Sequence, residues 1–197
     1  MPKVVPDYRN QARETITESA SKLIFKSGFQ DTGMDEIARN IGVTKGTLYL
    51  YFPSKAALLA EACRRNMTIL ESTMQKAFDG DISKGIENFI VNELSLPDYV
   101  KFHWIVAMAE INKSPEIKKI LVESYDGYVS ILTSFISKLK KLGLVSNSPD
   151  PEIVAKKLIA FHNGILLSVM LGESAENAIS LFREGVSAIL QAPTPKP

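Results

Sequence analysis

The sequence is poor in the residues that carry most metal and nucleophilic chemistry. Its 197 residues include one cysteine, Cys63, and two histidines, which stand far apart and without motif context. A single cysteine cannot form an intramolecular disulfide, which fits a reducing compartment. The sequence contains no glycine-rich phosphate loop, nucleophile elbow or cluster of metal ligands. These absences argue against an enzyme, and we expect no cofactor and no metal.

Long hydrophobic runs are also missing. No apolar run reaches the roughly 18 residues of a membrane span. The first residues, MPKVVPDYRN, lack the apolar region of a signal peptide. We therefore expect a cytoplasmic protein with no membrane partner. With 45% hydrophobic and 23% charged residues, the composition is that of an ordinary globular chain.

The net charge of +1 says nothing about partners, but its distribution is uneven. Residues 1–65 carry ten Lys and Arg against seven Asp and Glu, whereas the rest carries thirteen against fifteen. A basic N-terminal third is compatible with nucleic-acid binding, although a solvated surface has the same composition.

The spacing of apolar residues predicts an all-α fold of about nine helices, since the alternation typical of strands is missing. Gly28 ends the first helix, and Thr32 is a predicted N-cap paired with Asp35. The second predicted helix ends at Gly42. The third runs from Thr44 to about Phe52, and the fourth from Ser54 to about Phe78. The remaining five cover about 82–95, 99–112, Ser114-Pro115 to Gly143, 151–171 and 174–190. The Pro-rich tail, residues 192–197, is predicted to be disordered.

Residues 34–52, MDEIARNIGVTKGTLYLYF, have the pattern of a helix-turn-helix. Ala38 is small where two short helices must cross, and Gly42 tolerates the positive φ of the turn. Apolar residues at the offsets of a shared core are Ile37, Ile41, Val43 and Leu48. The second helix keeps a polar outward face, on which Gly46 would let the backbone approach DNA closely, although glycine costs a helix roughly 1 kcal/mol.

The segment GFQDTGMDEIARNIGVTKGTLYLYFPSKAALLAEA resembles the DNA-binding signature of the TetR family of transcriptional regulators, and the resemblance covers about residues 10–65. It implies that Thr44, Lys45, Gly46 and Thr47 face the major groove. It further implies that Tyr49, Tyr51 and Lys55 contact phosphates. Thr32 and Gly33 would offer a hydroxyl and an amide at a helix N-terminus, which is a natural anion site. Tyr51 replaces a frequent His of the family, and Gly33 a frequent Thr or Ser.

The resemblance implies a division into a helix-turn-helix domain, residues 1–53, and a ligand-binding and dimerisation domain, residues 54–191. Aromatic and Met side chains of the middle helices are candidate lining for an apolar ligand, with plain core packing as the alternative. These candidates are Met74, Phe78, Trp104, Met108, Tyr125, Tyr128 and Phe135. The last two helices carry more apolar surface than one core requires, which predicts a homodimer. The candidate interface residues are Phe161, Gly164, Ile165, Phe182 and Val186, with Gly164 allowing close helix approach.

We therefore expect a dimeric repressor that binds palindromic double-stranded DNA and is released by a small, largely apolar ligand such as a lipid, an acyl chain or a drug. The alternative is a helix-turn-helix protein that serves architecture or protein contacts and has no ligand. The salt dependence of DNA binding separates the two, because each neutralised phosphate of a specific complex adds about 0.9 to the slope.

Overall fold

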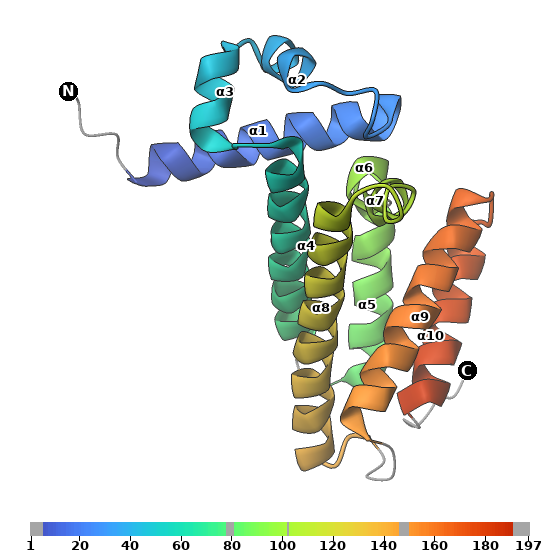
Figure 1. The fold of residues 1–197 in the computed structure, drawn as a ribbon. Coiled ribbons are helices and arrows are strands. Elements are labelled where there is room, and N and C mark those ends of the chain that lie inside the picture. Colours follow the sequence, from blue (N-terminus) through green and yellow to red (C-terminus); the bar gives the residue numbers. More distant parts are fainter. Residues whose placement is uncertain (1–5, 78–80, 102, 146–149, 191–197) are drawn as a thin grey trace. The chain divides into compact units, whose positions relative to one another are not determined.

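The computed structural model describes residues 6–77, 81–101, 103–145 and 150–190, and this part of the chain is helical without strands. Figure 1 shows the helices in chain order. They are α1 (Pro6–Ser27), α2 (Met34–Ile41), α3 (Lys45–Tyr51), α4 (Lys55–Ala77), α5 (Ile82–Ser95), α6 (Asp98–Lys101), α7 (His103–Met108), α8 (Pro115–Lys141), α9 (Pro151–Met170) and α10 (Ala175–Leu190).

The chain forms two compact units. Unit 1 comprises Met1–Asn66 and Asp98–Glu123, and unit 2 comprises Met67–Pro97 and Ser124–Pro197. Helices α4 and α8 each contribute to both units. The predicted domain boundary after residue 53 therefore does not coincide with the division between the units, since unit 1 continues to Asn66 and also includes Asp98–Glu123.

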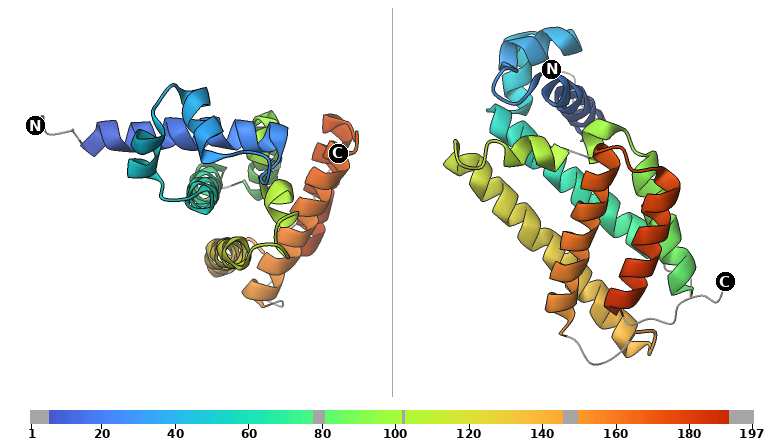
Figure 2. Two further views of the ribbon diagram at one scale, coloured as in Figure 1. Left: turned by 45° about the horizontal axis from the view of Figure 1, so that its top comes forward. Right: turned by 90° about the vertical axis from the view of Figure 1, so that its right-hand side faces the viewer.

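Unit 1 contains the N-terminal helices with α6, α7 and the first part of α8. One core cluster joins α1, α2, α3 and the start of α4 through Ile16, Ile37, Leu48, Phe52 and Leu58, all almost fully buried. A second cluster gathers Phe29, Leu59, Cys63, Ala107 and Ile117. Figure 2 shows α2 and α3 lying against α1. This packing supplies most of the stability of helices as short as α2 and α3.

Unit 2 is built around α5, the second part of α8, α9 and α10. In Figure 2, α9 and α10 run side by side, and α10 also packs against α5. Asp150 caps α9, because its carboxylate accepts a hydrogen bond of 2.7 Å from the amide of Glu152. The core includes Ile90, Ile136, Ile165, Phe182 and Val186.

Most predicted helix ends agree with the structure. Gly28 and Gly42 follow α1 and α2 with φ of 89° and 78°, and Thr44 caps α3. The N-cap prediction at Thr32 is wrong: Gly33 occupies that position without a side-chain hydrogen bond. The predicted helix 99–112 is described as α6 and α7, so the described residues form ten helices. The predicted tail, residues 192–197, lies outside the described residues.

Candidate nucleic-acid interface

The turn between α2 and α3 is closed by backbone hydrogen bonds. The Val43 amide donates to the Ala38 carbonyl at 3.0 Å, and the Gly42 amide donates to the Arg39 carbonyl at 3.2 Å. Gly42 has a left-handed backbone conformation, which only a residue without a Cβ adopts easily. The predicted core offsets are confirmed: Ile37, Ala38 and Leu48 are buried, and Ile41 and Val43 are partly buried against them.

Thr44 begins the second helix of the motif. Its hydroxyl oxygen accepts a hydrogen bond of 3.1 Å from the amide of Thr47, and the two hydroxyls lie 2.8 Å apart. Such a cap stabilises a helix by about 1 kcal/mol. Two residues predicted to face the major groove are therefore held together at the start of α3.

Lys45, Gly46, Tyr49 and Leu50 are exposed in α3, whereas Leu48 is buried. The ammonium of Lys45 lies 2.8 Å from the carboxylate of Asp35, and this hydrogen-bonded partner raises the pKa of Lys45. The lysine stays charged, and because both partners are exposed it can exchange Asp35 for a phosphate at small cost. Sequence reasoning passed over Leu50 because a leucine in a helix usually indicates core.

The start of α2 differs from the prediction at Thr32. Its side chain is fully buried, and its hydroxyl donates a hydrogen bond of 2.8 Å to the Gly28 carbonyl. The prediction of an accessible Thr32 hydroxyl is thus wrong, because this group is buried and donates its hydrogen bond within the α1–α2 connection. Gly33 is exposed with extended backbone, and no side chain caps the amides that follow it.

Lys55 also differs from the expected solvent-facing cation. Its ammonium donates hydrogen bonds to the carbonyls of Phe29 and Thr32, the latter at 2.8 Å, and lies 4.3 Å from the centre of the Phe29 ring. Burial lowers the pKa of Lys55, although Glu110 and Asp31 act in the opposite direction. The lysine holds the α1–α2 connection to the start of α4.

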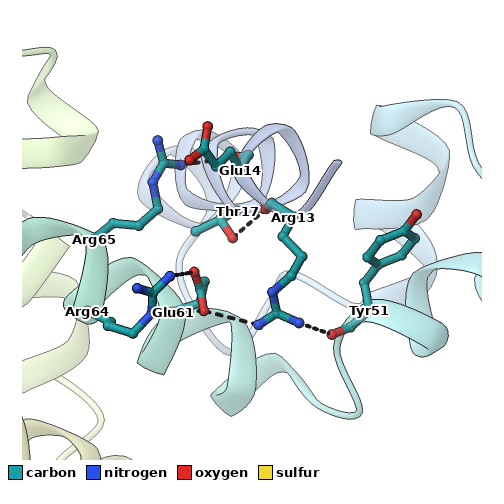
Figure 3. A network of polar contacts seen from close by, with 7 residues as sticks. All are labelled: Arg13, Glu14, Thr17, Tyr51, Glu61, Arg64 and Arg65. Carbon is teal, nitrogen blue, oxygen red and sulfur yellow. Dashed lines mark hydrogen bonds and ion pairs between the residues drawn. The ribbon is translucent and has the colours of Figure 1, made fainter. Parts of the chain in front are cut away.

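An arginine that the sequence did not single out anchors the end of α3 (Figure 3). Arg13 donates hydrogen bonds to the backbone carbonyl of Tyr51 at 2.8 Å and to the carboxylate of Glu61 at 3.0 Å. Its guanidinium lies 4.4 Å from the centre of the Phe52 ring. Glu61 is buried and also accepts hydrogen bonds from Arg64. Arg13 of α1 thus joins the C-terminal end of α3 to α4, while the Tyr51 ring is partly buried.

The residues predicted to line a ligand site are divided between the two units. Trp104 and Met108 belong to unit 1, whereas Met74, Tyr125, Tyr128 and Phe135 belong to unit 2, and Phe78 lies outside the described residues. Met108 and Tyr125 are exposed, Met74 is buried, and Phe135 packs against the core of unit 2. Unit 1 holds an apolar cavity of about 30 Å³ that none of the seven lines. Its walls are Ala20, Ser21, Ile24, Phe25, Phe29, Leu58, Leu59, Ala62, Tyr99 and Ala107.

The predicted dimerisation residues are corrected in part. Ile165, Phe182 and Val186 are buried in the core of unit 2, and Phe161 stacks on Phe182 with ring centres 6.1 Å apart. Helical spacing indicates an apolar stripe on α9 and α10, but it does not show that the core of the same chain already covers this stripe. Gly164 alone is exposed, with nothing within 4 Å of an added Cβ. The glycine that permits close helix approach is instead Gly185, where an added Cβ would clash with the Phe161 ring.

In the C-terminal half of α9 the exposed residues are apolar, whereas its first turns expose Glu152, Lys156 and Lys157. Ala160, Gly164 and Leu167 lie on one exposed line of α9, and the exposed C-cap residue Leu171 continues this line. Among the described residues, α9 is the one helix long and apolar enough to cross a membrane by length and composition. Core helices of soluble proteins also meet these two criteria. The described residues contain no group of metal-ligating side chains.

Comparison with known proteins agrees with this geometry. Residues 16–62 match the model of bacterial regulatory proteins of the tetR family, and residues 103–191 match that of the C-terminal region of BetI-type transcriptional repressors. The chain belongs to the TetR family of helix-turn-helix transcriptional regulators.

Individual relatives are distant over the full length. The regulator LmrA of Bacillus subtilis is 27% identical over 181 residues, which cover 87% of this chain and 91% of LmrA. Matches to the first three curated relatives span only 19%, 44% and 17% of those proteins.

Two solved structures share the fold. GusR of Salmonella enterica has a TM-score of 0.80 at 21% identity, covering 96% of this chain and 100% of GusR. A regulator from Saccharomonospora viridis, solved in complex with choline, has a TM-score of 0.68 at 22% identity, covering 90% and 96%.

Proposed function

We propose that this regulator is a cytoplasmic repressor that binds a palindromic operator as a homodimer and is released by a small, largely apolar ligand. The observation that carries the proposal is the outward face of α3. Lys45, Gly46 and Tyr49 are exposed there, while Leu48 of the same helix is fully buried. A helix so presented after a glycine turn is the element that other helix-turn-helix proteins insert into the major groove.

The contacts divide into two kinds. Thr44, Lys45 and Thr47 stand at the N-terminal end of α3, where side chains reach base edges and specify sequence. Tyr49 and Tyr51, nearer its C-terminal end, would hold phosphates and fix the register. The uncapped amides after Gly33 would donate hydrogen bonds to another phosphate, because a helix N-terminus favours an anion.

Homodimerisation would use the exposed stripe of α9 together with the exposed Leu181 of α10. Only 22% of the most apolar 18-residue stretch of α9 is buried. A soluble protein rarely leaves so apolar a helix in water, so a second copy is the occupant that also satisfies the two-fold symmetry of a palindrome.

Effector control would act through α4. This helix begins at Lys55 in unit 1, where it holds the α1–α2 connection, and carries Met74 in unit 2. A ligand that favours one tilt of α4 would change the spacing of the two recognition helices, which must match one DNA turn of about 34–36 Å. Ligand and operator would then weaken each other reciprocally, by roughly 1–3 kcal/mol. The choline bound to the S. viridis regulator supports a small organic effector as a class.

The test is selection of genomic fragments by the purified full chain, followed by footprinting. A protected palindrome, bound by two chains with a steep salt dependence, is the expected result. Fragments without a shared site would overturn the proposal in favour of an architectural helix-turn-helix. Compounds suggested by the neighbouring genes then test release, and saturating occupancy that leaves operator affinity unchanged would contradict the effector part.

A further inference from the structure

Leu50 has no structural reason to be a leucine. It lies in α3 and its relative exposure is 77%, whereas Leu48, two residues earlier, is 0% exposed. Two residues span about 200° around a helix, so Leu50 points away from the core that Leu48 fills. No core cluster includes it.

Gly46 precedes Leu50 by one turn and lies on the same outermost line of α3. An added Cβ at Gly46 would meet only the Thr44 hydroxyl oxygen, at 3.9 Å, which is an ordinary contact. The fold therefore has room for alanine at this position and gains nothing from glycine inside a helix. Gly46 and Leu50 together mark the part of α3 that would approach a bound duplex most closely.

A lone leucine on a polar face fits one feature of the major groove. By helical spacing its neighbours on the surface of α3 are Gly46, Thr47 and Tyr49, which suit DNA better than an apolar protein surface. Among the four bases, thymine alone presents an apolar group in this groove, its C5-methyl. We propose that Leu50 is a specificity-determining residue that contacts the C5-methyl group of a thymine in each operator half-site. This inference rests on the proposed function.

The experiment removes the methyl group and nothing else. In the footprinted operator, each thymine is replaced by deoxyuridine, symmetrically in both half-sites, and affinity is measured at fixed salt. With the unaltered protein we expect a loss of about three- to tenfold at one or two positions, as burial of a methyl group on each side implies. Leu50→Ala should bind the thymine and deoxyuridine operators equally well.

Two controls make the outcome specific. Leu142→Ala removes another leucine of high exposure, 56%, outside the helix-turn-helix, and should keep the full response to deoxyuridine. Thermal unfolding of Leu50→Ala should match the unaltered protein, since the side chain packs against no core cluster. The assignment is overturned if deoxyuridine leaves operator affinity unchanged at every position. It is also overturned if Leu50→Ala loses as much affinity on deoxyuridine substitution as the unaltered protein does. In both cases operator binding itself stands. Absence of any operator overturns the proposed function and the assignment with it.

Discussion

Arg13 and Glu61 are 48 residues apart in sequence and form a hydrogen-bonded ion pair of 3.0 Å. The same guanidinium holds the Tyr51 carbonyl at the end of α3. Burial acts to raise the pKa of Glu61, but hydrogen bonds from Arg64 and Arg13 outweigh it, and the pKa is lowered. Helix α3 is thus held at its last residue, Tyr51, by a charge network that includes α4.

Replacing Arg13 should therefore affect both stability and DNA binding. We expect Arg13→Gln to lower the free energy of unfolding by about 1–3 kcal/mol, because two charge-assisted hydrogen bonds are lost while Arg64 still pairs Glu61. Operator affinity should fall roughly tenfold as the end of α3 loosens. Urea unfolding and fluorescence anisotropy measure the two effects. Arg9→Gln, one turn earlier at an exposed position, is the control for stability and should change it by less than about 0.5 kcal/mol.

Gly46 and Gly42 should respond oppositely to alanine. Gly46→Ala should raise the free energy of unfolding by about 0.5–1 kcal/mol, since the new Cβ has space in a helix. It should nevertheless weaken operator binding, because the backbone no longer approaches the DNA. Gly42→Ala should lower stability by about 1 kcal/mol or more, since φ at this position is 78°. Denaturant unfolding and operator titration of both variants decide the point; a Gly46→Ala protein that bound DNA normally would contradict the close approach.

Local signals explain why so much of the fold could be predicted. Gly28, Gly42 and Gly143 stand at helix ends with positive φ, and Thr44, Ser54 and Ser114 each accept a hydrogen bond from an amide three residues on. These features act within a few residues, so sequence reveals them. The helix-turn-helix could be predicted for the same reason, since its turn and its core offsets lie within one short segment.

Residues whose roles depend on distant partners could not be predicted. Thr32 and Lys55 were expected to face DNA, yet each bonds a backbone carbonyl of the α1–α2 connection. Arg13 gave no signal, because its partners are 38 and 48 residues away. Apolar spacing marked the buried stripe of α9 and α10 as an interface, because periodicity does not distinguish a face covered within the monomer from one covered by another chain.

Phe161 and Gly185 are expected to be coupled. An added Cβ at Gly185 would clash with the Phe161 ring, which is stacked on Phe182 and has little room to move. Gly185→Ala should therefore lower the free energy of unfolding by about 1–3 kcal/mol through overpacking. Gly185→Ala combined with Phe161→Leu should be more stable than the sum of the single changes predicts, which a double-mutant cycle measures. Gly164→Ala, at a position with open space around it, is the matched control; strict additivity would contradict the coupling.

His162 should make the protein less stable in acid. Its ring contacts Phe89 and Phe182 edge-on, and its Nε2 atom is buried without a hydrogen-bond partner. Burial lowers the pKa of His162 from 6.5 to about 4, against a weaker opposing hydrogen bond with Asn163.

Between these two values the unfolded chain binds a proton that the folded chain does not, so stability is present above pH 6.5 and falls as the pH drops toward 4. The loss should reach at most about 3 kcal/mol, reduced if the protonated ring pairs with Glu93, whose carboxylate lies 3.9 Å away. Urea unfolding at fixed protein concentration from pH 7 to pH 4 should show this slope. His162→Leu should flatten it within that window, and an unchanged slope would assign the acid sensitivity to other groups.

A charge on the outer side of α9 should separate the proposed dimer without unfolding the monomer. Leu167 is 45% exposed and lies one turn from Gly164. Leu167→Glu would bury an unpaired carboxylate in each half of a dimer interface, which is costly, whereas in a monomer the same carboxylate would stay hydrated. Light scattering should then give the monomer mass, with helicity unchanged and operator affinity greatly reduced, since one helix-turn-helix reads one half-site. Val122→Glu, which charges a residue of α8 with 49% exposure, should leave the dimer intact. A Leu167→Glu protein that remained dimeric would move the interface away from this stripe.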